Sequence, residues 1–303
     1  MKPIFKLIVA LLAATAMTGH ADAQQLTGTL KKIKDTGSIV IGHRESSIPF
    51  SYYDDKQKVV GYAVDLCLRI VDAVKMHLKM DKIDIKYNPV TSATRIPLMA
   101  NGTIDLECGS TTNNLTRQKQ VSYTITHFVT ATRFVSKKAD NLKTVNDLKG
   151  KTVVSTSGTT NIKLATKFNV EKNLGMNIIA AKDHAEAFLT VQTGRAAAFF
   201  MDDILLYSLV ATSKNPQDFA ISADALSVEP YGIMLRKDDP AFKKVVDAAM
   251  TQIYKGGAIN GIYEKWFLKP IPPKGVNLNV PMSTQMKKVV ATPTDSGKPE
   301  DYE

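Results

Sequence analysis

The sequence predicts an α/β protein with mostly parallel sheets, and two observations lead to this class. Runs of β-branched and apolar residues alternate with helical segments along most of the chain, which is the order found when helices connect parallel strands. Polar clusters also follow the predicted strands or begin the next helix, and open α/β sheets bind ligands at the carboxyl ends of their strands. The pattern therefore predicts the fold class and the edge of the sheet that carries function.

The helices are predicted from apolar residues spaced three and four positions apart, and the strands from short apolar runs. The clearest helix covers residues 61–78, where Cys67 and Val74 share the apolar face. Asp183 and Asp239 are expected as helix N-caps. In chain order we expect a helix over 26–34, a strand over 37–42, a strand end and turn over 51–55, the helix over 61–78, a strand over 83–89, a short helix after Ser92, strands over 103–107 and 129–136, a short helix over 142–149, a strand over 151–155, a helix to 168, a strand over 177–180, a helix over 183–194, a strand over 196–201, a helix from 202, a strand over 231–236, and helices over 239–254 and 263–267.

The N-terminus has the composition of a secretory signal peptide. Lys2 and Lys6 flank the start of an apolar stretch over 4–17, and Ala21-Asp22-Ala23 matches the cleavage pattern. An uncleaved membrane anchor is the alternative, but the apolar stretch is shorter than the about 20 residues that a span needs. We therefore expect residues 1–23 to be removed and the mature chain to be exported to the periplasm.

The chain is basic, with a formal net charge of +10 at pH 7 that would fall to +9 once Lys2, Lys6 and Asp22 are removed with the leader. A basic surface can serve nucleic acids or anionic membranes. Here the lysines and arginines are spread without a dense block, and no nucleic-acid motif is recognised. We therefore expect no nucleic-acid partner, and we interpret the charge as solubility with mild attraction for anionic ligands.

The two cysteines, Cys67 and Cys108, leave two interpretations open. In an exported chain they are plausible disulfide partners, and they would meet if the helix of Cys67 packs beside the strand that ends at Cys108. The alternative is two buried free thiols. Two thiols and five scattered histidines show no spacing typical of metal ligands, so we expect neither a metal site nor another cofactor.

The most informative stretch is Cys108-Gly109-Ser110-Thr111-Thr112-Asn113-Asn114-Leu115-Thr116-Arg117. A predicted strand leads into small hydroxyl and amide side chains, and Arg117 follows five residues after Thr112. Because arginine can hold a carboxylate with two hydrogen bonds and serine or threonine can add further donors, this stretch suits a small carboxylate. A polar surface loop with a solvated arginine is the alternative.

The segment Gly61-Tyr62-Ala63-Val64-Asp65-Leu66 resembles the signature of the polar amino-acid-binding proteins of ABC transporters, although that family usually has an acidic residue in place of Ala63. The resemblance extends along nearly the whole mature chain. The segments that are similar are 101–105, 110–117, 148–151, 157–160, 194–195 and 201–202, whereas Ala197-Ala198 departs from the Asp-Ala pair that is frequent there. Three segments together resemble the glutamate/aspartate-binding members of this family. They are His43-Arg44-Glu45, 108–114 and Lys182-Asp183-His184.

The resemblance implies a two-lobed type II periplasmic binding protein fold whose lobes are joined by a two-strand hinge. The crossovers between the lobes are expected near 129–135 and 228–234. Ligand would bind between the lobes and close them. The expected division is residues 24–130 and 231–280 in lobe 1, residues 131–230 in lobe 2, and residues 281–303 as a C-terminal extension that is partly disordered.

The resemblance also implies roles for individual residues. Arg117 would bind the α-carboxylate of an amino acid, with Ser110 and Thr112 as further donors. Thr160, at the start of a lobe 2 helix, would donate to the same ligand after closure, because a helix N-terminus favours an anion. Asp202 would accept the ligand ammonium. Taken alone, Asp202 and its neighbour Asp203 are equally typical of a helix N-cap. One of them can cap the helix while the other accepts the ligand ammonium.

One arginine is enough for the α-carboxylate, so four of the candidate site residues remain without a role: Arg44, Ser92, Arg95 and His184. These four residues indicate a ligand with an acidic side chain. Two further guanidiniums near one small cleft would repel each other unless a second anion lies between them. The alternatives are that both arginines pair with Glu45 or another acidic residue and that His184 is an ordinary first-turn residue. The expected ligand is therefore L-glutamate or L-aspartate, which a monomeric protein would deliver to an ABC transporter permease in the inner membrane. A further candidate for the cleft wall is Tyr231.

Two other functions compete with binding. Exported cyclohexadienyl dehydratases resemble this family, but an enzyme of that kind needs a general acid near the leaving group. The candidates Glu45, Glu107 and Asp183 have no clear partner in the sequence. A sensor or scaffold domain is disfavoured because no transmembrane or signalling segment is recognised after the leader. We therefore expect a binding protein and not an enzyme.

Overall fold

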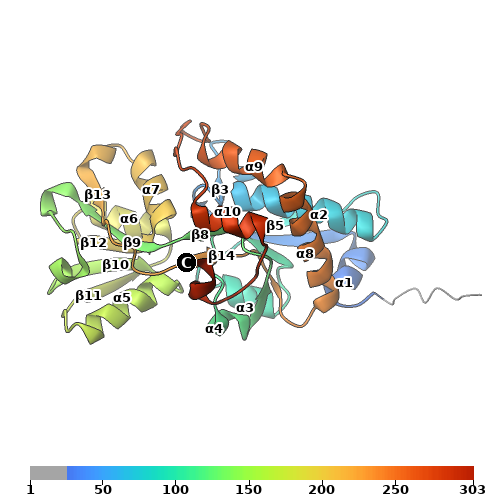
Figure 1. Cartoon of the computed structure of the whole chain (residues 1–303), viewed down its shortest axis with the longest axis horizontal. Coiled ribbons are helices and arrows are strands. Elements are labelled where there is room, and N and C mark those ends of the chain that lie inside the picture. The colour runs from blue at the N-terminus through green and yellow to red at the C-terminus, as the bar shows by residue number, and fades with distance from the viewer. Residues whose placement is uncertain (1–25) are drawn as a thin grey trace, which may run out of the picture.

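The computed structural model describes residues 26–303, so the predicted leader and its cleavage site lie outside the described residues. The chain forms two lobes, each built around a five-stranded sheet, and two short strands run between them (Figure 1). The predicted α/β class and the two-lobed architecture are confirmed. Within the described range, no helix combines the length and the apolar composition needed to cross a membrane.

Lobe 1 has a sheet of order β5-β1-β6-β15-β7, in which β1 runs parallel to β5 and β6. The helices α2, α8 and α9 pack on one another at one side of this sheet, and α3 packs on the other. The elements of this lobe are α1 (Gly28–Thr36), β1 (Ser38–His43), β2 (Ser46–Ser47), β3 (Ser51–Tyr53), β4 (Val59–Val60), α2 (Tyr62–His77), β5 (Asp84–Pro89), α3 (Arg95–Ala100), β6 (Leu106–Cys108), α4 (Leu115–Gln118), β7 (Val121–Tyr123), β15 (Met234–Arg236), α8 (Pro240–Lys255) and α9 (Ala258–Phe267).

Lobe 2 has a sheet of order β11-β10-β12-β9-β13 with helices on both faces. Successive side chains of a strand point to opposite faces, so Val153 joins the apolar cluster that includes Ala165 of α5, whereas Val154 joins the cluster that includes Phe188 of α6. Burial on both faces explains the continuous apolar runs of the central strands β10 and β12. The elements of this lobe are β9 (Thr132–Lys137), η1 (Lys138–Asp140), η2 (Val145–Leu148), β10 (Thr152–Thr156), α5 (Thr160–Glu171), β11 (Asn177–Ala181), α6 (His184–Gln192), β12 (Ala198–Asp202), α7 (Asp203–Thr212), η3 (Pro216–Asp218) and β13 (Phe219–Ile221).

The prediction of mostly parallel sheets is wrong, because two of the four strand pairings in each five-stranded sheet are antiparallel, and these pairings follow from the crossovers. The strands that run between the lobes, β8 (Phe128–Thr130) and β14 (Glu229–Tyr231), pair antiparallel with each other. The chain enters each sheet directly after a crossover, as β9 in lobe 2 and as β15 in lobe 1. Accordingly β9 pairs antiparallel with β12, and β15 pairs antiparallel with β6 and β7.

The helix ends agree with the predicted capping residues. The Asp183 carboxylate accepts a hydrogen bond from the Glu186 backbone N–H at 2.9 Å, and the Asp239 carboxylate accepts one from Phe242 at 3.2 Å. The predicted helix over 142–149 is shorter and is a 3-10 helix. These caps begin α6 and α8, and the first residue of α6, His184, faces the other lobe as described below.

The C-terminal segment differs from the expected extended and partly disordered tail. It contains α10 (Thr284–Ala291) and η4 (Pro299–Tyr302), and it folds back along α8 and the connecting strands (Figure 1). Met286 and Val289 bury one face of α10, and the Tyr302 hydroxyl is 2.7 Å from the Thr126 hydroxyl. Prolines and charges dominate the composition of this segment, so two apolar positions spaced for a helix were not recognised as a helix face.

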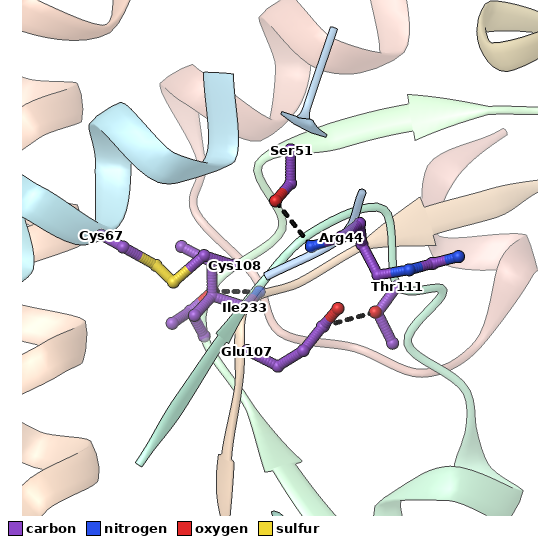
Figure 2. The surroundings of a disulfide bond; sticks show 8 residues. Arg44, Ser51, Cys67, Glu107, Cys108, Thr111 and Ile233 are labelled. Atoms are coloured by element: carbon purple, nitrogen blue, oxygen red, sulfur yellow. Dashed lines mark hydrogen bonds between the residues drawn. A yellow bond between two sulfur atoms is a disulfide. The ribbon is translucent and has the colours of Figure 1, made fainter. Parts of the chain in front are cut away.

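A disulfide joins Cys67 of α2 to Cys108 at the end of β6, with the two Cα atoms 6.2 Å apart (Figure 2). This confirms the disulfide interpretation over two free thiols. Glu107, the preceding residue of β6, points away from the disulfide to the other side of the strand. The bond therefore fixes the strand end directly before the polar stretch over 109–117.

Removal of the disulfide should destabilise lobe 1. The bond closes a loop with a sequence separation of 41 residues, for which the loss of unfolded-chain entropy corresponds to about 4 kcal/mol. The variant with both Cys67→Ala and Cys108→Ala should therefore lose about 2–5 kcal/mol of unfolding free energy in urea titrations. Wild-type protein under reducing conditions is the control and should show a similar loss. An unchanged denaturation midpoint in both samples would contradict a structural role.

Candidate functional site

A narrow cavity, with about 190 Å³ of space not filled by atoms, lies between the lobes, at the carboxyl ends of β6, β10 and β12. Its lining comprises Ser92, Arg95, Ser110 and Thr112 from lobe 1 and Thr159, Thr160, Asn161, His184, Met201, Asp202 and Leu205 from lobe 2. Seven of the nine residues predicted for the site line this cavity, and the other two, Arg44 and Arg117, contact its lining residues. A wider groove, with about 1320 Å³ of space not filled by atoms, lies between α1, α2 and α8, and its described lining residues are mainly apolar and include no arginine or carboxylate.

The polar stretch after β6 is buried, so its interpretation as a solvated surface loop is wrong. Arg117 is 6% exposed, and its Nη1 donates to the Thr112 carbonyl at 2.8 Å. The Asn114 side chain caps the short helix α4 by accepting from the Arg117 backbone N–H at 2.9 Å. The hydroxyl of Ser110 is buried and has no hydrogen-bond partner among the described residues. The loop therefore holds the Arg117 guanidinium and leaves a hydroxyl free at the cavity.

Arg95 and Arg44 bring two buried guanidiniums to one end of the cavity, and each is 2% exposed. Arg95 begins α3, and its Nη1 donates to the Ser110 carbonyl at 3.1 Å and lies 3.9 Å from a carboxylate oxygen of Glu107. Burial lowers the pKa of Arg95 to about 9, which leaves it protonated at neutral pH. Within residues 26–303 Arg44 forms no ion pair, and its Nη1 has no hydrogen-bond partner. The alternative, in which both arginines pair with Glu45 or another acidic residue, holds only in part: neither arginine forms an ion pair with the exposed Glu45, whereas Arg95 pairs with Glu107.

His184 faces Arg44 across the cleft and is neutral. Its Nε2 lies 3.4 Å from Arg44 Nη2, and its Nδ1 lies 2.8 Å from the Thr156 hydroxyl. Because a guanidinium can only donate, Nε2 must accept, and Nδ1–H then donates to Thr156. Burial, with added repulsion from Arg44 and Arg95, holds the pKa of His184 well below its usual value. His184 is thus a first-turn residue of α6 that also lines the cavity.

The start of α5 supplies donors from lobe 2. Thr159 is the N-cap and accepts from the Ile162 backbone N–H at 3.2 Å, which leaves the first-turn N–H groups of Thr160 and Asn161 facing the cavity end of the helix. The Thr160 hydroxyl itself donates to Glu229 at 2.9 Å. The donor expected from Thr160 is therefore its backbone N–H, which the helix dipole supports toward an anion.

Asp202 occupies the N-cap position of α7, but its carboxylate makes no capping hydrogen bond and is held at the cavity by two donors. Asn161 Nδ2 donates to its carboxylate at 2.7 Å, and the Tyr231 hydroxyl donates to its other oxygen. The neighbouring Asp203 instead pairs with Arg133 at 3.2 Å. Burial, with the nearby charge of Glu229, raises the pKa of Asp202 to about 7. The two aspartates therefore have different tasks, and Asp202 is the one with a carboxylate at the cavity.

The two lobes touch each other around the cavity. Arg117 Nη2 of lobe 1 donates to the Gly158 carbonyl of lobe 2 at 3.2 Å. A Cβ atom added to Gly158 would lie 2.6 Å from the Ala93 Cα and 2.7 Å from the Ser92 carbonyl oxygen. Only a residue without a side chain permits this approach. The lobes therefore adopt a closed arrangement in which Arg117 contacts both sides of the cleft.

Several residues at the site were not predicted. Asn161 is one of them, although its position in the first turn after Ser157-Gly158-Thr159-Thr160 was a usable signal. Thr159, Met201 and Leu205 also line the cavity without having been predicted as site residues. Glu229 was not predicted because it is a single acidic residue in a strand, without a local pattern that indicates its partner, and Glu107 was expected only as a candidate general acid of the enzymatic alternative. In the part of the chain that the structure describes, no group of three or more His, Cys, Asp and Glu side chains is placed to hold a metal ion.

Comparisons with known proteins agree with this geometry. The chain matches the family of bacterial extracellular solute-binding proteins, family 3, over residues 39–269. It is 53% identical over 285 residues to the L-glutamate/L-aspartate-binding protein of Pseudomonas aeruginosa, with 94% of each chain covered. It is 49% identical to the glutamate/aspartate import solute-binding protein of Salmonella typhimurium, with 96% of this chain and 97% of that one covered. The solved structure of an ancestral arginine-binding protein bound to arginine superposes with a TM-score of 0.69 at 28% identity, covering 76% of this chain and 98% of that one.

Substitution of Gly158 should prevent closure. Gly158 and Gly150 both lie in lobe 2 with φ of +77° and +69°, so alanine at either position incurs a similar backbone strain. Only at Gly158 does the new Cβ collide with lobe 1, whereas nothing lies within 4 Å of the Cβ position at Gly150. Overlap of this kind typically costs about 1–3 kcal/mol, so Gly158→Ala should weaken ligand binding at least about fivefold.

Titration calorimetry of both variants with the acidic amino acid expected from the sequence measures this effect, and small-angle scattering at saturation reports the radius of gyration. The control, Gly150→Ala, should bind like the wild type. Equal losses of affinity in the two variants would show that backbone strain, and not contact between the lobes, is responsible.

Proposed function

The chain belongs to the bacterial extracellular solute-binding proteins of family 3, and from this premise we propose that it captures L-glutamate or L-aspartate in the periplasm for an ABC importer. The captured amino acid is delivered to permease subunits in the inner membrane. The proposal is supported by the names of the relatives from P. aeruginosa and S. typhimurium, which the chain matches over nearly their full length. The proposal includes removal of the leader after Ala23 and action as a monomer.

The observation that carries the proposal is that two buried guanidiniums, those of Arg44 and Arg95, lie at one end of the cavity in addition to the one that an α-carboxylate needs. An amino-acid zwitterion needs one cation for its carboxylate and one anion for its ammonium, and Arg117 and Asp202 are suited to these tasks. Arg44 and Arg95 remain, buried on the lobe 1 side, with Arg44 Nη1 and Arg95 Nε lacking hydrogen-bond partners among the described residues. A buried, incompletely satisfied guanidinium is costly unless an anion reaches it, so the surplus favours a ligand with an acidic side chain.

The proposed contacts divide the site into two halves. Arg117, with Ser110, Thr112 and the α5 start at Thr160, receives the α-carboxylate, and Asp202 receives the ammonium. At the other end, the side-chain carboxylate lies among the groups that the lobes bring together there. These groups are Arg44, Ser92, Arg95 and His184. The Ser92 and Ser110 hydroxyls, both without partners among residues 26–303, supply further donors to the ligand.

The enzymatic alternative is not favoured. Of the three candidate acids, Glu45 is exposed, Asp183 is used as the N-cap of α6, and Glu107 accepts from the Thr111 hydroxyl at 2.5 Å. None of the three is among the residues that line the cavity. A general acid must lie within hydrogen-bond reach of the leaving group. The arrangement is therefore that of a binding protein, in agreement with the relatives.

The ligand assignment can be tested by comparing L-glutamate with L-glutamine. Glutamine would leave a buried guanidinium facing a neutral amide, and an unpaired buried charge costs about 3–5 kcal/mol, so glutamine should bind at least about two orders of magnitude more weakly. Arg95→Met should remove most of this preference. Arg117→Met should weaken both ligands together, because both carry the α-carboxylate.

Titration calorimetry of each variant with both ligands gives the comparison. Arg195→Met, at an exposed position of lobe 2, is the matched control and should behave like the wild type. A wild-type protein that binds L-glutamine as tightly as L-glutamate would exclude the acidic ligand.

Binding should also release a proton at Asp202. Its raised pKa of about 7 means that the carboxyl is partly protonated near neutral pH in the closed site before a ligand enters. A ligand ammonium requires the carboxylate, so the affinity should fall about tenfold per pH unit below pH 7.

Calorimetry at about pH 6 in two buffers with different protonation enthalpies measures the number of protons released, which we expect to approach one. Asp203→Asn, a substitution at the neighbouring aspartate that pairs with Arg133, should retain this release. An affinity that does not change between about pH 5.5 and 8 would show that Asp202 does not titrate with binding.

A further inference from the structure

Glu107 is a carboxylate in the centre of the lobe 1 sheet, between Leu106 and Cys108 of β6. It has no exposed surface. Glutamate is almost never fully buried unless it is paired, and an apolar residue at a buried position is often as stable or more stable. Packing alone therefore does not account for the charge, and its surroundings indicate what the charge does.

The Glu107 side chain lies beside the two arginines of the proposed side-chain subsite. Thr111 donates to one carboxylate oxygen at 2.5 Å (Figure 2). Arg95 Nη1 in turn donates to the Thr111 hydroxyl. The other carboxylate oxygen lies 3.9 Å from Arg95 Nη1. A Cβ atom at Gly109 would lie 2.5 Å from that oxygen and 3.0 Å from Arg44 Cγ, so the carboxylate also approaches the Arg44 side chain across Gly109.

These groups can be counted as charges. Arg44 and Arg95 contribute two positive charges, and arginine stays protonated in proteins. Glu107 contributes one negative charge as a carboxylate that accepts from the Thr111 hydroxyl and lies beside the guanidinium of Arg95. His184 adds no charge, because its Nε2 accepts from the Arg44 guanidinium. The subsite therefore carries one net positive charge before a ligand enters.

We propose that Glu107 is a positioning residue that sets the charge of the side-chain subsite to one, so that the subsite matches a ligand side chain with a single negative charge. The inference rests on the proposed function and identifies a specificity determinant outside the cavity lining. With Glu107 in place, one ligand carboxylate brings the buried charge to zero. Without it, one ligand carboxylate leaves an uncompensated guanidinium in the closed site.

Glu107→Gln tests the proposal, because glutamine keeps the shape and can still accept from Thr111, while the subsite charge rises from one to two. The second positive charge should favour L-glutamate and disfavour L-glutamine. The ratio of their dissociation constants should therefore rise at least about tenfold over the wild-type ratio, since close buried charges interact by several kcal/mol. A role in shape alone predicts an unchanged or smaller ratio, and either result overturns the proposal.

Thr111→Val is the matched control. It removes the hydroxyl between Arg95 and Glu107 and leaves every charge in place, so affinities for both ligands should fall together while their ratio stays within about threefold of the wild type. If Thr111→Val raises the ratio as much as Glu107→Gln does, geometry and not charge sets the preference, and the proposal fails.

Stability provides a second readout for Glu107→Gln. The uncompensated charge should lower the melting temperature without ligand, and L-glutamate should raise it by more than it does in the wild type. A variant that L-glutamate does not stabilise, or that fails to fold in its presence, overturns the proposal. Failure of the wild type to bind either L-glutamate or L-aspartate overturns the proposed function as well. A wild type that discriminates, together with an unchanged ratio in Glu107→Gln, overturns only the role of Glu107.

Discussion

The pairing of the polar loop after β6 with the crossover strand β14 is the constraint on which the site depends. The Asn113 backbone N–H donates to the Pro230 carbonyl at 2.7 Å, and the Gly232 N–H donates to the Thr111 carbonyl at 3.0 Å. Side chains of the same short strand reach lobe 2, where Tyr231 donates to Asp202 and Glu229 accepts from Thr160. One strand thus sets the positions of cavity groups that come from both lobes.

Two further features hold the same loop from other directions. The disulfide anchors Cys108, directly before the loop, to α2. The C-terminal segment reaches it from the opposite end of the chain, because Asn113 Nδ2 donates to the Asp295 carbonyl at 2.8 Å. A loop fixed at its start, its middle and its partner strand has its conformation determined on folding. The entropy cost of ordering this loop therefore falls on folding and does not reduce the affinity for a ligand.

The sequence was informative where local pattern decides structure. The apolar stripe of α2 and the N-caps Asp183 and Asp239 depend on spacing within a few residues, and they were predicted correctly. The rule that ligands bind at the carboxyl ends of strands, together with the resemblance, brought most predicted site residues to one cavity. What could not be predicted depends on contacts between distant segments. Glu107 is one isolated acid in a strand, and its significance follows only from Arg44 and Arg95, which reach it through the fold.

Closure and recognition are coupled because several groups have partners in both lobes. Arg117 donates to Thr112 in its own lobe and to Gly158 in the other, and Arg44 faces His184 across the cleft. When the lobes separate, these cross-lobe contacts are lost and buried guanidiniums return to water. A ligand anion that compensates these charges in the closed state therefore favours closure by its differential affinity, which is the only way in which a ligand can shift such an equilibrium. The buried charges that select the ligand are, for this reason, also the groups through which binding closes the protein.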